Sequence, residues 1–195
     1  MIGNDIVDLQ CAKNESDWHR AGFLDKVFDE NEKNYLRNAS DPNILVWRMW
    51  TMKESAYKAN VRRSSKRFFN PKRISCTLLD PRTGSVSIDA MKYQTLTETN
   101  SKYIYTVALT HSTTEVESSC FSLKEDTYSG QHRETYETLI KKLAIELGLA
   151  KNSIHIKKDS AGIPLVYVKN QLLKRHLTMT HHGHFAAFAL TNYAL

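Results

Sequence analysis

The stretch WTMKESAYK, residues 50–58, decides how the first part of this chain folds. It lies within residues 44–61, which hold no Gly or Pro and many good helix formers, so the sequence predicts a helix there. On a helical wheel an aromatic stripe and a second apolar stripe fall on opposite sides, and Glu54 lies within the aromatic one. Such a helix should be buried from two directions, which makes a carboxylate in one stripe unexpected.

The bulk properties of the chain limit its class. Its 195 residues, 41% hydrophobic and 10% aromatic, are typical of a globular protein with one compound domain or two small halves. There is no run of eighteen apolar residues and no signal-peptide segment, so we expect a soluble, unexported protein without a membrane span. Three widely spaced cysteines form neither a disulfide framework nor a C-x-x-C metal pair, which favours the reducing cytoplasm.

The charge balance indicates an anionic partner. The formal net charge is +6 and the isoelectric point is about 9.2. Nucleic acid, a phosphorylated cofactor and an acidic protein are the classes that a basic protein of this kind would attract.

The order of predicted elements repeats along the chain. Each half runs through a helix, a strand, a turn that opens with Asp and closes with Gly, another strand, and a strand around Thr-His. The two turns are 80–84 and 159–162, and the Thr-His pairs are 110–111 and 180–181. This pattern favours an α+β fold made of two pseudo-twofold related halves with antiparallel sheets. We expect the halves at 1–123 and 133–195, a linker at 124–132, and one cleft between them.

Glu54 has two interpretations. It can form an i,i+4 ion pair with Lys58, worth about 0.3–0.5 kcal/mol on an exposed helix. An acid among aromatic side chains is costly, however, and one flexible lysine compensates poorly. Mg²⁺ would compensate better, since it takes one or two carboxylates and fills its other positions with water and phosphate oxygens. Asp5, near the end of the predicted opening strand, is the candidate second ligand; Asp8 is possible, although strand alternation turns it to the other face.

A phosphate ligand would need partners other than a glycine-rich loop. The chain has seven glycines and neither G-x-x-x-x-G-K-[ST] nor G-x-G-x-x-G. Point charges remain, and most of them individually are expected to lie on a solvated basic face: Lys58, Arg62, Arg63, Lys66, Arg67, Arg133, Lys157 and Lys158. The histidines of THHGH, residues 180–184, lack the spaced Cys or His partners of a zinc site. A histidine at a strand end can instead donate to phosphate oxygens.

Three segments together resemble a known family. GNDIVDL near the chain start, F-x-x-x-E at 28–32 and WTMKESAYK at 50–58 are similar to the paired signature of the 4′-phosphopantetheinyl transferases. The opening motif also resembles that of the short holo-acyl-carrier-protein synthases. Downstream, GIP at 162–164 and LTMTHHGHFAAFAL at 177–190 resemble motifs of the Sfp-like members, in which they belong to the N-terminal half. The halves therefore resemble those of the Sfp-like type in reversed order, with the metal-binding half first.

The resemblance implies roles for particular residues. Asp5 and Glu54 would be the Mg²⁺ ligands, and Glu54 would also help to deprotonate the attacking serine. Lys58 would contact a phosphate of CoA and act in catalysis, and His181 would bind the 3′-phosphate. Thr180, Arg133 and Lys158 are further candidates for CoA binding.

Two departures from the family pattern bear on these roles. Val7 stands where Sfp-like members usually carry Glu, and Asp8 is the candidate substitute. Ile163 replaces the basic residue of G-K/R-P.

The function implied by the resemblance is Mg²⁺-dependent transfer of 4′-phosphopantetheine from CoA to a serine of an acidic acyl or peptidyl carrier protein. We expect a cytoplasmic monomer that binds neither nucleic acid nor membrane. Two alternatives stay open. One is a nucleic-acid-binding module that uses the basic run 62–73 with Phe68 and Phe69 as stacking residues. The other is a degenerate family member that binds CoA or carrier protein without transfer.

Overall fold

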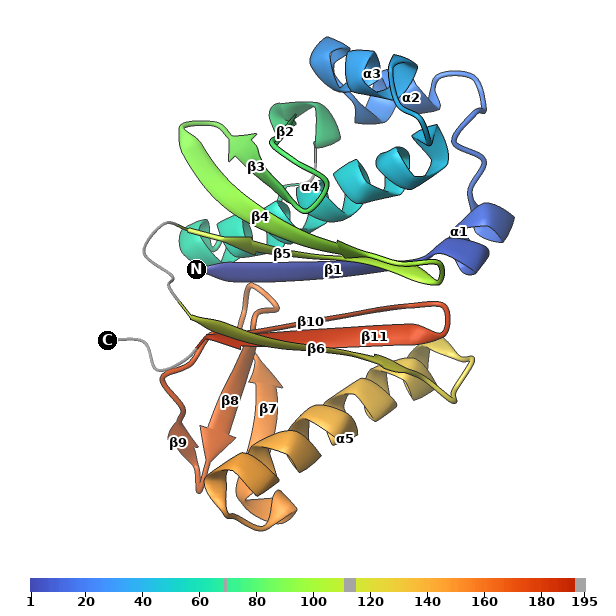
Figure 1. Ribbon diagram of the computed structural model, residues 1–195. Helices are drawn as coiled ribbons and strands as arrows, with labels where there is room; N and C mark the ends of the chain where they lie inside the picture. Colours follow the sequence, from blue (N-terminus) through green and yellow to red (C-terminus); the bar gives the residue numbers. More distant parts are fainter. Residues whose placement is uncertain (69, 111–114, 192–195) are drawn as a thin grey trace.

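The computed structural model describes residues 1–68, 70–110 and 115–191. It is an α+β structure with antiparallel sheets, as predicted (Figure 1). Two sheets lie face to face in the middle of the molecule, and each carries a long helix, α4 or α5, on its outer side.

The first half is a five-stranded sheet in the order β1-β5-β4-β3-β2. Three short helices and one long helix connect β1 to β2. β1, which opens the chain, pairs with β5, the last strand of this sheet in sequence. Its elements are β1 (Ile2–Asp8), α1 (Leu9–Glu15), α2 (Phe23–Val27), α3 (Glu30–Arg37), α4 (Pro42–Ser64), the 3-10 helix η1 (Pro71–Arg73), β2 (Ile74–Leu78), β3 (Thr83–Ile88), β4 (Met91–Thr99) and β5 (Tyr103–Leu109).

The second half repeats this order with less helix. A three-stranded sheet runs β10-β11-β6, and a smaller sheet, β7-β8-β9, lies beside it. The succession β6, α5, β7, β8, β10, β11 matches β1, α4, β2, β3, β4, β5. Its elements are β6 (Val116–Ser122), α5 (Tyr128–Leu147), the 3-10 helix η2 (Lys151–Ser153), β7 (Ile154–Lys158), β8 (Pro164–Val168), β9 (Gln171–Leu172), β10 (Leu177–His182) and β11 (Phe185–Thr191).

The order of elements thus agrees with the predicted repeat, but the sheets divide the chain elsewhere. β6 lies within the predicted first half, 1–123, yet it pairs with β11 of the second sheet. α5 begins at Tyr128, inside the segment expected to be a linker, because Thr127 caps the helix by accepting from the Gly130 amide at 3.1 Å. Whether the halves act as separate domains stays a prediction. His111, expected to be a structural remnant of the repeat, lies outside the described residues.

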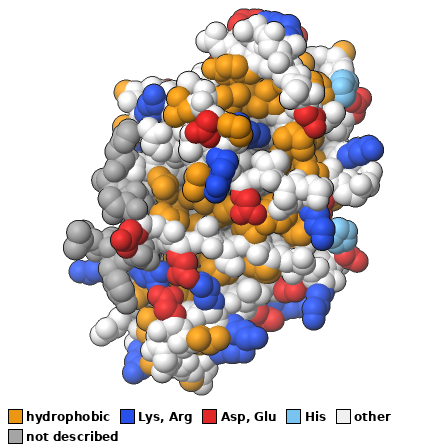
Figure 2. Space-filling view, viewed as in Figure 1, with side chains coloured by type: hydrophobic (Ala, Val, Ile, Leu, Met, Phe, Trp, Pro, Cys, Tyr) orange, Lys and Arg blue, Asp and Glu red, His pale blue; other side chains and the backbone are white. Residues whose placement is uncertain are grey.

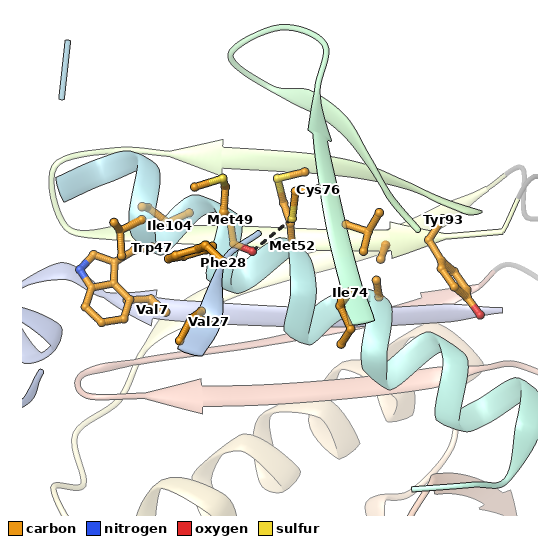
Figure 3. Packing of buried hydrophobic residues seen from close by; sticks show 14 of the residues in the cluster. Val7, Val27, Phe28, Trp47, Met49, Met52, Ile74, Cys76, Tyr93 and Ile104 are labelled. Atoms are coloured by element: carbon orange, nitrogen blue, oxygen red, sulfur yellow. Dashed lines mark hydrogen bonds between the residues drawn. The ribbon is translucent and has the colours of Figure 1, made fainter. Parts of the chain in front are cut away.

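Helix α4 is buried from both sides, as its two apolar stripes predict. Asp41 caps its first turn and Pro42 occupies the first helical position, while Ser65 ends it in the left-handed region at φ 54°. Met49 and Met52 are fully buried against the sheet. Figure 3 shows these side chains meeting Phe28, Trp47 and residues of β2, β4 and β5 in one continuous core.

A buried ion pair between Lys53 of α4 and Glu32 of α3 connects this core to α3. The Lys53 ammonium donates to Glu32 Oε2 at 2.7 Å and to three backbone carbonyls, and both side chains are fully buried. The other Glu32 oxygen accepts from the Cys76 amide at 2.7 Å. Lys53 of WTMKESAYK and Glu32 of F-x-x-x-E thus stabilise the packing of α3, α4 and β2.

The facing sheets meet through small and aromatic side chains. β1 and β5 of the first half pack on β10 and β11 of the second, through Ile2, Ile6, Tyr105, Val107, Ala187 and Ala189. On the face seen in Figure 2, Lys, Arg, Asp and Glu side chains are interspersed with apolar surface. Within the described residues, no helix is long and apolar enough to span a membrane.

Candidate active site

Two cavities lie where the halves meet. The larger, about 420 Å³, runs between the C-terminal half of α4, the start of α5, the 158–164 segment and β10. The smaller, about 280 Å³, lies between β1, α1 and the middle of α4. His181 lines both. The two cavities therefore adjoin, and both halves contribute residues to them.

Gly3 explains how α4 comes to lie against the opening strand. A Cβ at this position would sit 2.0 Å from the Ser55 carbonyl oxygen and 2.6 Å from the Ala59 amide nitrogen. Only glycine permits so close an approach of helix and strand backbones. Ser55 then donates to the Thr106 carbonyl at 2.9 Å, which fixes the helix to β5 as well. This contact brings one turn of α4, with Glu54 and Lys58, beside Asp5.

The next two residues of the GND motif connect β1 to the second half. Asn4 accepts from the Thr178 hydroxyl at 2.8 Å, and Asp5 Oδ1 accepts from the Thr180 hydroxyl at 2.9 Å. Both threonines lie on β10. The strand that carries the first candidate metal ligand is thus held across the interface between the halves.

Glu54 lines the smaller cavity with Asp5, Trp47 and Trp50. No donor within the described residues lies within hydrogen-bond distance of its carboxylate. Burial, and secondarily the negative charge of Asp5, raises the pKa of Glu54 to about 7, against the opposing effect of Lys58. A carboxylate in this environment is available either to a cation or to a proton.

Lys58 binds Asp5 rather than Glu54. Its ammonium donates to Asp5 Oδ1 at 2.8 Å and to the Asn4 carbonyl at 2.9 Å. The i,i+4 ion pair weighed from the sequence is therefore not formed, since no Glu54–Lys58 contact lies within 4 Å. The reason is geometric: Asp5 lies directly beside Lys58 across the close strand–helix contact.

Asp8 has a structural role. Oδ1 accepts from the amides of Gln10 and Cys11, which caps α1, and Oδ2 accepts from the His184 amide at 2.9 Å. The side chain is buried and lines neither cavity. With both oxygens engaged, Asp8 is not placed to replace the acid that Val7 removes from the family pattern.

The larger cavity has cationic walls. Lys58, Arg62, Arg67 and Lys158 line it, together with His132 and His181. Arg62 donates to the Leu177 carbonyl, and its burial lowers its pKa to about 10. Of these four Lys and Arg side chains, only Lys58 forms an ion pair with a carboxylate of the described residues, so most of the positive charge is available to an anion.

Other basic candidates lie elsewhere. The Arg133 guanidinium donates to Glu125 at 3.0 Å and lines neither cavity. Lys157 lies over the Tyr167 ring, 5.4 Å from its centroid. Phe68 packs edge-on against Tyr57 with Arg73 over its ring, so it is not a free stacking surface, and Phe69 lies outside the described residues.

The wall of the larger cavity that α5 contributes was not predicted from the sequence. Tyr128, His132, Thr135 and Tyr136 line the larger cavity, and the His132 and Tyr136 rings stack with centroids 4.3 Å apart. These residues recur at helical spacing after a threonine cap. Tyr128 and His132 fall within residues 124–132, which were interpreted as a linker, whereas Thr135 and Tyr136 follow it.

The donor set of the smaller cavity fits Mg²⁺. Glu54 offers a carboxylate without hydrogen bonds among the described residues, and Asp5 engages only Oδ1, which leaves Oδ2. Hard oxygen ligands of this kind suit Mg²⁺, with water and phosphate completing its shell. A second cluster, Cys11, Glu15 and His182, is less suitable. His182 Nδ1 accepts from the Asp8 amide, so the neutral ring keeps its proton on Nε2, the atom that faces Glu15.

Comparison with known families decides the class. The sequence profile of the 4′-phosphopantetheinyl transferase superfamily (ACPS) matches residues 1–125, more than half of the chain. The chain belongs to this superfamily. Members of this superfamily use CoA and a divalent metal ion and act with carrier proteins. Membership supports a transferase activity for this protein. The resemblance seen in the GND and WTMKESAYK motifs is confirmed.

Solved structures include a similar one. The crystal structure of Thermotoga maritima holo-[acyl-carrier-protein] synthase aligns over 88% of this chain and 83% of its own, with 8% sequence identity and a TM-score of 0.42. No curated protein matches the sequence.

Proposed function

We propose that this superfamily member transfers 4′-phosphopantetheine from CoA to a serine of an acyl or peptidyl carrier protein and requires Mg²⁺. The observation that carries the proposal is the juxtaposition of Asp5 and Glu54 in one cavity with a cationic second cavity beside it. A carboxylate pair next to a cationic cleft suits a metal-bound pyrophosphate.

The cationic cavity suits the rest of CoA. Lys58, Arg62 and Lys158 supply charge for its phosphates, and His181, beside Thr180, is the proposed contact of the 3′-phosphate. Arg133 is not part of this proposal, because it pairs with Glu125. Proximity of His181 to both cavities would let one ligand extend from the nucleotide end to the metal.

The proposed reaction assigns a role to each of these positions. The carrier serine oxygen attacks the phosphorus that bears the pantetheine arm, the pyrophosphate P–O bond breaks, and 3′,5′-ADP leaves. Bound to Asp5 and Glu54, Mg²⁺ would neutralise the pyrophosphate charge. The cations of the larger cavity hold the leaving nucleotide, and Glu54 receives the serine proton directly or through water. The pKa of about 7 belongs to the metal-free side chain; bound Mg²⁺ would keep the carboxylate ionised and able to accept the proton.

Arg67 argues against a degenerate protein. Its Nε donates to the Ala161 carbonyl at 2.7 Å, and a Cβ on Gly162 would lie 1.7 Å from an Arg67 terminal nitrogen. A guanidinium therefore lies on the loop whose own basic residue is replaced by Ile163. The positive charge absent from the motif in sequence is supplied by a neighbouring segment in space.

The proposed partners are CoA and an acidic carrier protein. We propose a monomer, because both halves of one chain line the cavities. A cytoplasmic location is consistent with three cysteines that form no disulfide.

The decisive test is transfer itself. The protein is incubated with CoA, Mg²⁺ and several apo-carriers, and each carrier is weighed by mass spectrometry. We expect a carrier to gain one phosphopantetheine group, with loss of the gain when Mg²⁺ is chelated. Unchanged carriers throughout, despite measurable CoA binding, would support the degenerate alternative, whereas salt-sensitive binding to single strands without CoA binding would support the nucleic-acid module.

A further inference from the structure

Gln131, in the first turn of α5, has an amide whose orientation is fixed. Its Nε2 donates to the Gly183 carbonyl at 2.9 Å and to the Asp126 carbonyl at 3.3 Å. Carbonyls only accept hydrogen bonds, so Nε2 must face them and Oε1 must lie on the other side. Oε1 is 3.0 Å from His181 Nδ1. Since Oε1 is an acceptor, Nδ1 has to be the donor.

The neighbouring histidine is held in the opposite way. The Asp8 amide donates to His182 Nδ1 at 3.0 Å. A backbone N–H only donates, so this Nδ1 carries no proton and the neutral ring is protonated on Nε2. Two adjacent histidines on β10 therefore have partners that demand different tautomers.

We propose that Gln131 is a positioning residue of the site, which holds His181 as the Nδ1–H tautomer and turns its Nε2 edge to the ligand. Gln131 itself lines neither cavity, whereas His181 lines both. The ring cannot present Nδ1 to a ligand without breaking the bond to Gln131. In the ligand-free protein Nε2 therefore bears the lone pair. It donates to a phosphate oxygen once the bound anion draws a second proton onto the ring, while Nδ1–H stays on Gln131.

The surroundings of His181 support a defined tautomer. Its pKa is lowered by burial and then by the nearby charges of His132, Lys58, His182 and Lys158, so the neutral ring predominates near neutral pH. The Tyr128 ring lies edge-on at 5.0 Å and limits rotation of the imidazole. Tautomer selection by a hydrogen bond to the other ring nitrogen is a recognised way to fix histidine chemistry.

Nitrogen-15 NMR of the ligand-free protein tests the tautomers directly. In uniformly labelled protein at pH 8.5, long-range proton–nitrogen correlations distinguish protonated from unprotonated ring nitrogens. We expect His181 to be protonated on Nδ1 and His182 on Nε2. A native spectrum with His181 protonated on Nε2 overturns the proposal.

Two substitutions separate the acceptor from the rest of the side chain. Gln131→Leu removes every bond and should release the His181 tautomer, while His182 stays as it is. Gln131→Glu keeps an acceptor for Nδ1–H and should preserve the tautomer, although its bonds to the carbonyls are lost. Gln10→Leu, at an exposed position of α1, is the matched control. Far-ultraviolet circular dichroism confirms that each variant is folded, and an unchanged His181 spectrum in folded Gln131→Leu also refutes the inference.

Affinity for CoA gives the functional readout, which rests on the proposed function. Gln131→Leu should raise the dissociation constant about 2- to 10-fold, the scale of one net hydrogen bond. His181→Gln, whose amide nitrogen reaches the place of Nε2, should retain more affinity than His181→Asn, which reaches that of Nδ1. Greater affinity in His181→Asn contradicts the inference. Failure of the native protein to bind CoA refutes the proposed function instead, and leaves the NMR result standing.

Discussion

The two halves of this molecule share a framework but differ at the positions that form the site. β1 and β6 each have seven residues and pair in the same register with β5 and β11, so the fourth residues, Asp5 and Ser119, correspond. Ser119 cannot replace a carboxylate ligand. The duplicated fold therefore supplies the strand register twice, while the carboxylate of the proposed metal site is present once.

The second residue of each strand shows why the helices sit differently. Gly3 lets α4 touch β1, whereas the corresponding residue of β6 is Glu117, which pairs with Lys142 and Arg175. α5 accordingly packs mainly on β7, β10 and β11. A carboxylate on α5 would not be brought beside β6 as Glu54 is brought beside β1.

The same comparison explains what the second half contributes. By register, Thr180 and His181 of β10 correspond to Glu98 and Thr99 of β4. Glu98 accepts from the Tyr103 hydroxyl at 2.8 Å, and neither Glu98 nor Thr99 lines a cavity. The first half thus contributes the carboxylates of Asp5 and Glu54, and the second half contributes the Thr180 hydroxyl and the His181 imidazole.

Removing the carboxylate of Glu54 should produce the largest effect. Glu54→Gln keeps the shape but loses the charge and the base, so transfer should slow by about two orders of magnitude or more. Carrier modification is followed by mass spectrometry across a Mg²⁺ titration. Glu137→Gln, on the exposed face of α5, is the control and should transfer normally. Wild-type transfer rates for Glu54→Gln at all Mg²⁺ concentrations would contradict the proposed role of the Glu54 carboxylate as metal ligand and base.

Gly3→Ala tests the close packing that distinguishes the halves. The new methyl group would overlap backbone atoms of α4, which cannot move as a flexible side chain can. We expect about 3 kcal/mol or more of destabilisation, at the upper end of overpacking effects. Glu117→Ala, at the matching position of β6, should cost less than about 1 kcal/mol, because Glu117 and Lys142 are partly exposed and Arg175 keeps its ion pair with Glu146. Urea unfolding of both variants measures the difference, and equal losses would remove the proposed role of the glycine.

Asp5→Asn should have a smaller effect, seen mainly in the metal requirement. The amide keeps an acceptor for Lys58 and Thr180 but lacks the charge that attracts Mg²⁺. The Mg²⁺ concentration for half-maximal rate should rise about 10-fold or more, the scale of losing one charge-assisted contact. Ser119→Ala, its counterpart in β6, should leave that concentration unchanged. An unchanged Mg²⁺ requirement for Asp5→Asn contradicts its role as ligand.

Local patterns made much of this predictable. The apolar stripes of residues 44–61 predicted a helix buried on both sides, and the repeated order of elements predicted a duplicated α+β fold. Glu54 and Asp5, far apart in sequence, were expected to act together, and they line one cavity. Their roles as ligands stay a prediction.

What could not be predicted depends on contacts between distant segments. Polar and apolar residues alternate only partly in β6, so it was not recognised as a strand of the second half. Its pairing with β11 depends on a register that only the folded sheet fixes. The choice of Lys58 between Glu54 and Asp5 depends on the Gly3 contact, which no helical wheel contains. The position of Arg67 on Gly162 likewise joins residues 95 positions apart.

The last and smallest expected effect concerns pH and metal-free stability. Folding raises the pKa of Glu54 from an ordinary value of 4.5 to about 7, chiefly through burial. Between these values the folded state holds a proton that the unfolded chain has released, so stability falls as pH rises through this window. Glu54→Gln lacks this loss. Above pH 7, in EDTA, it should exceed the wild type by about 1–2 kcal/mol, less than the full shift implies, because water screens part of the interaction.

The difference in free energy of unfolding between the wild type and Glu54→Gln should largely vanish near pH 4.5, where the side chain at position 54 is neutral in both folded proteins. Urea unfolding at pH 4.5, 6 and 8 measures it, and Glu137→Gln should follow the wild type throughout. Adding Mg²⁺ at pH 8 should then stabilise the wild type selectively, because a ligand that binds only the folded state shifts unfolding in its favour. A wild type and a Glu54→Gln variant that unfold alike at every pH would mean that Glu54 is as well solvated as a surface acid of the second half.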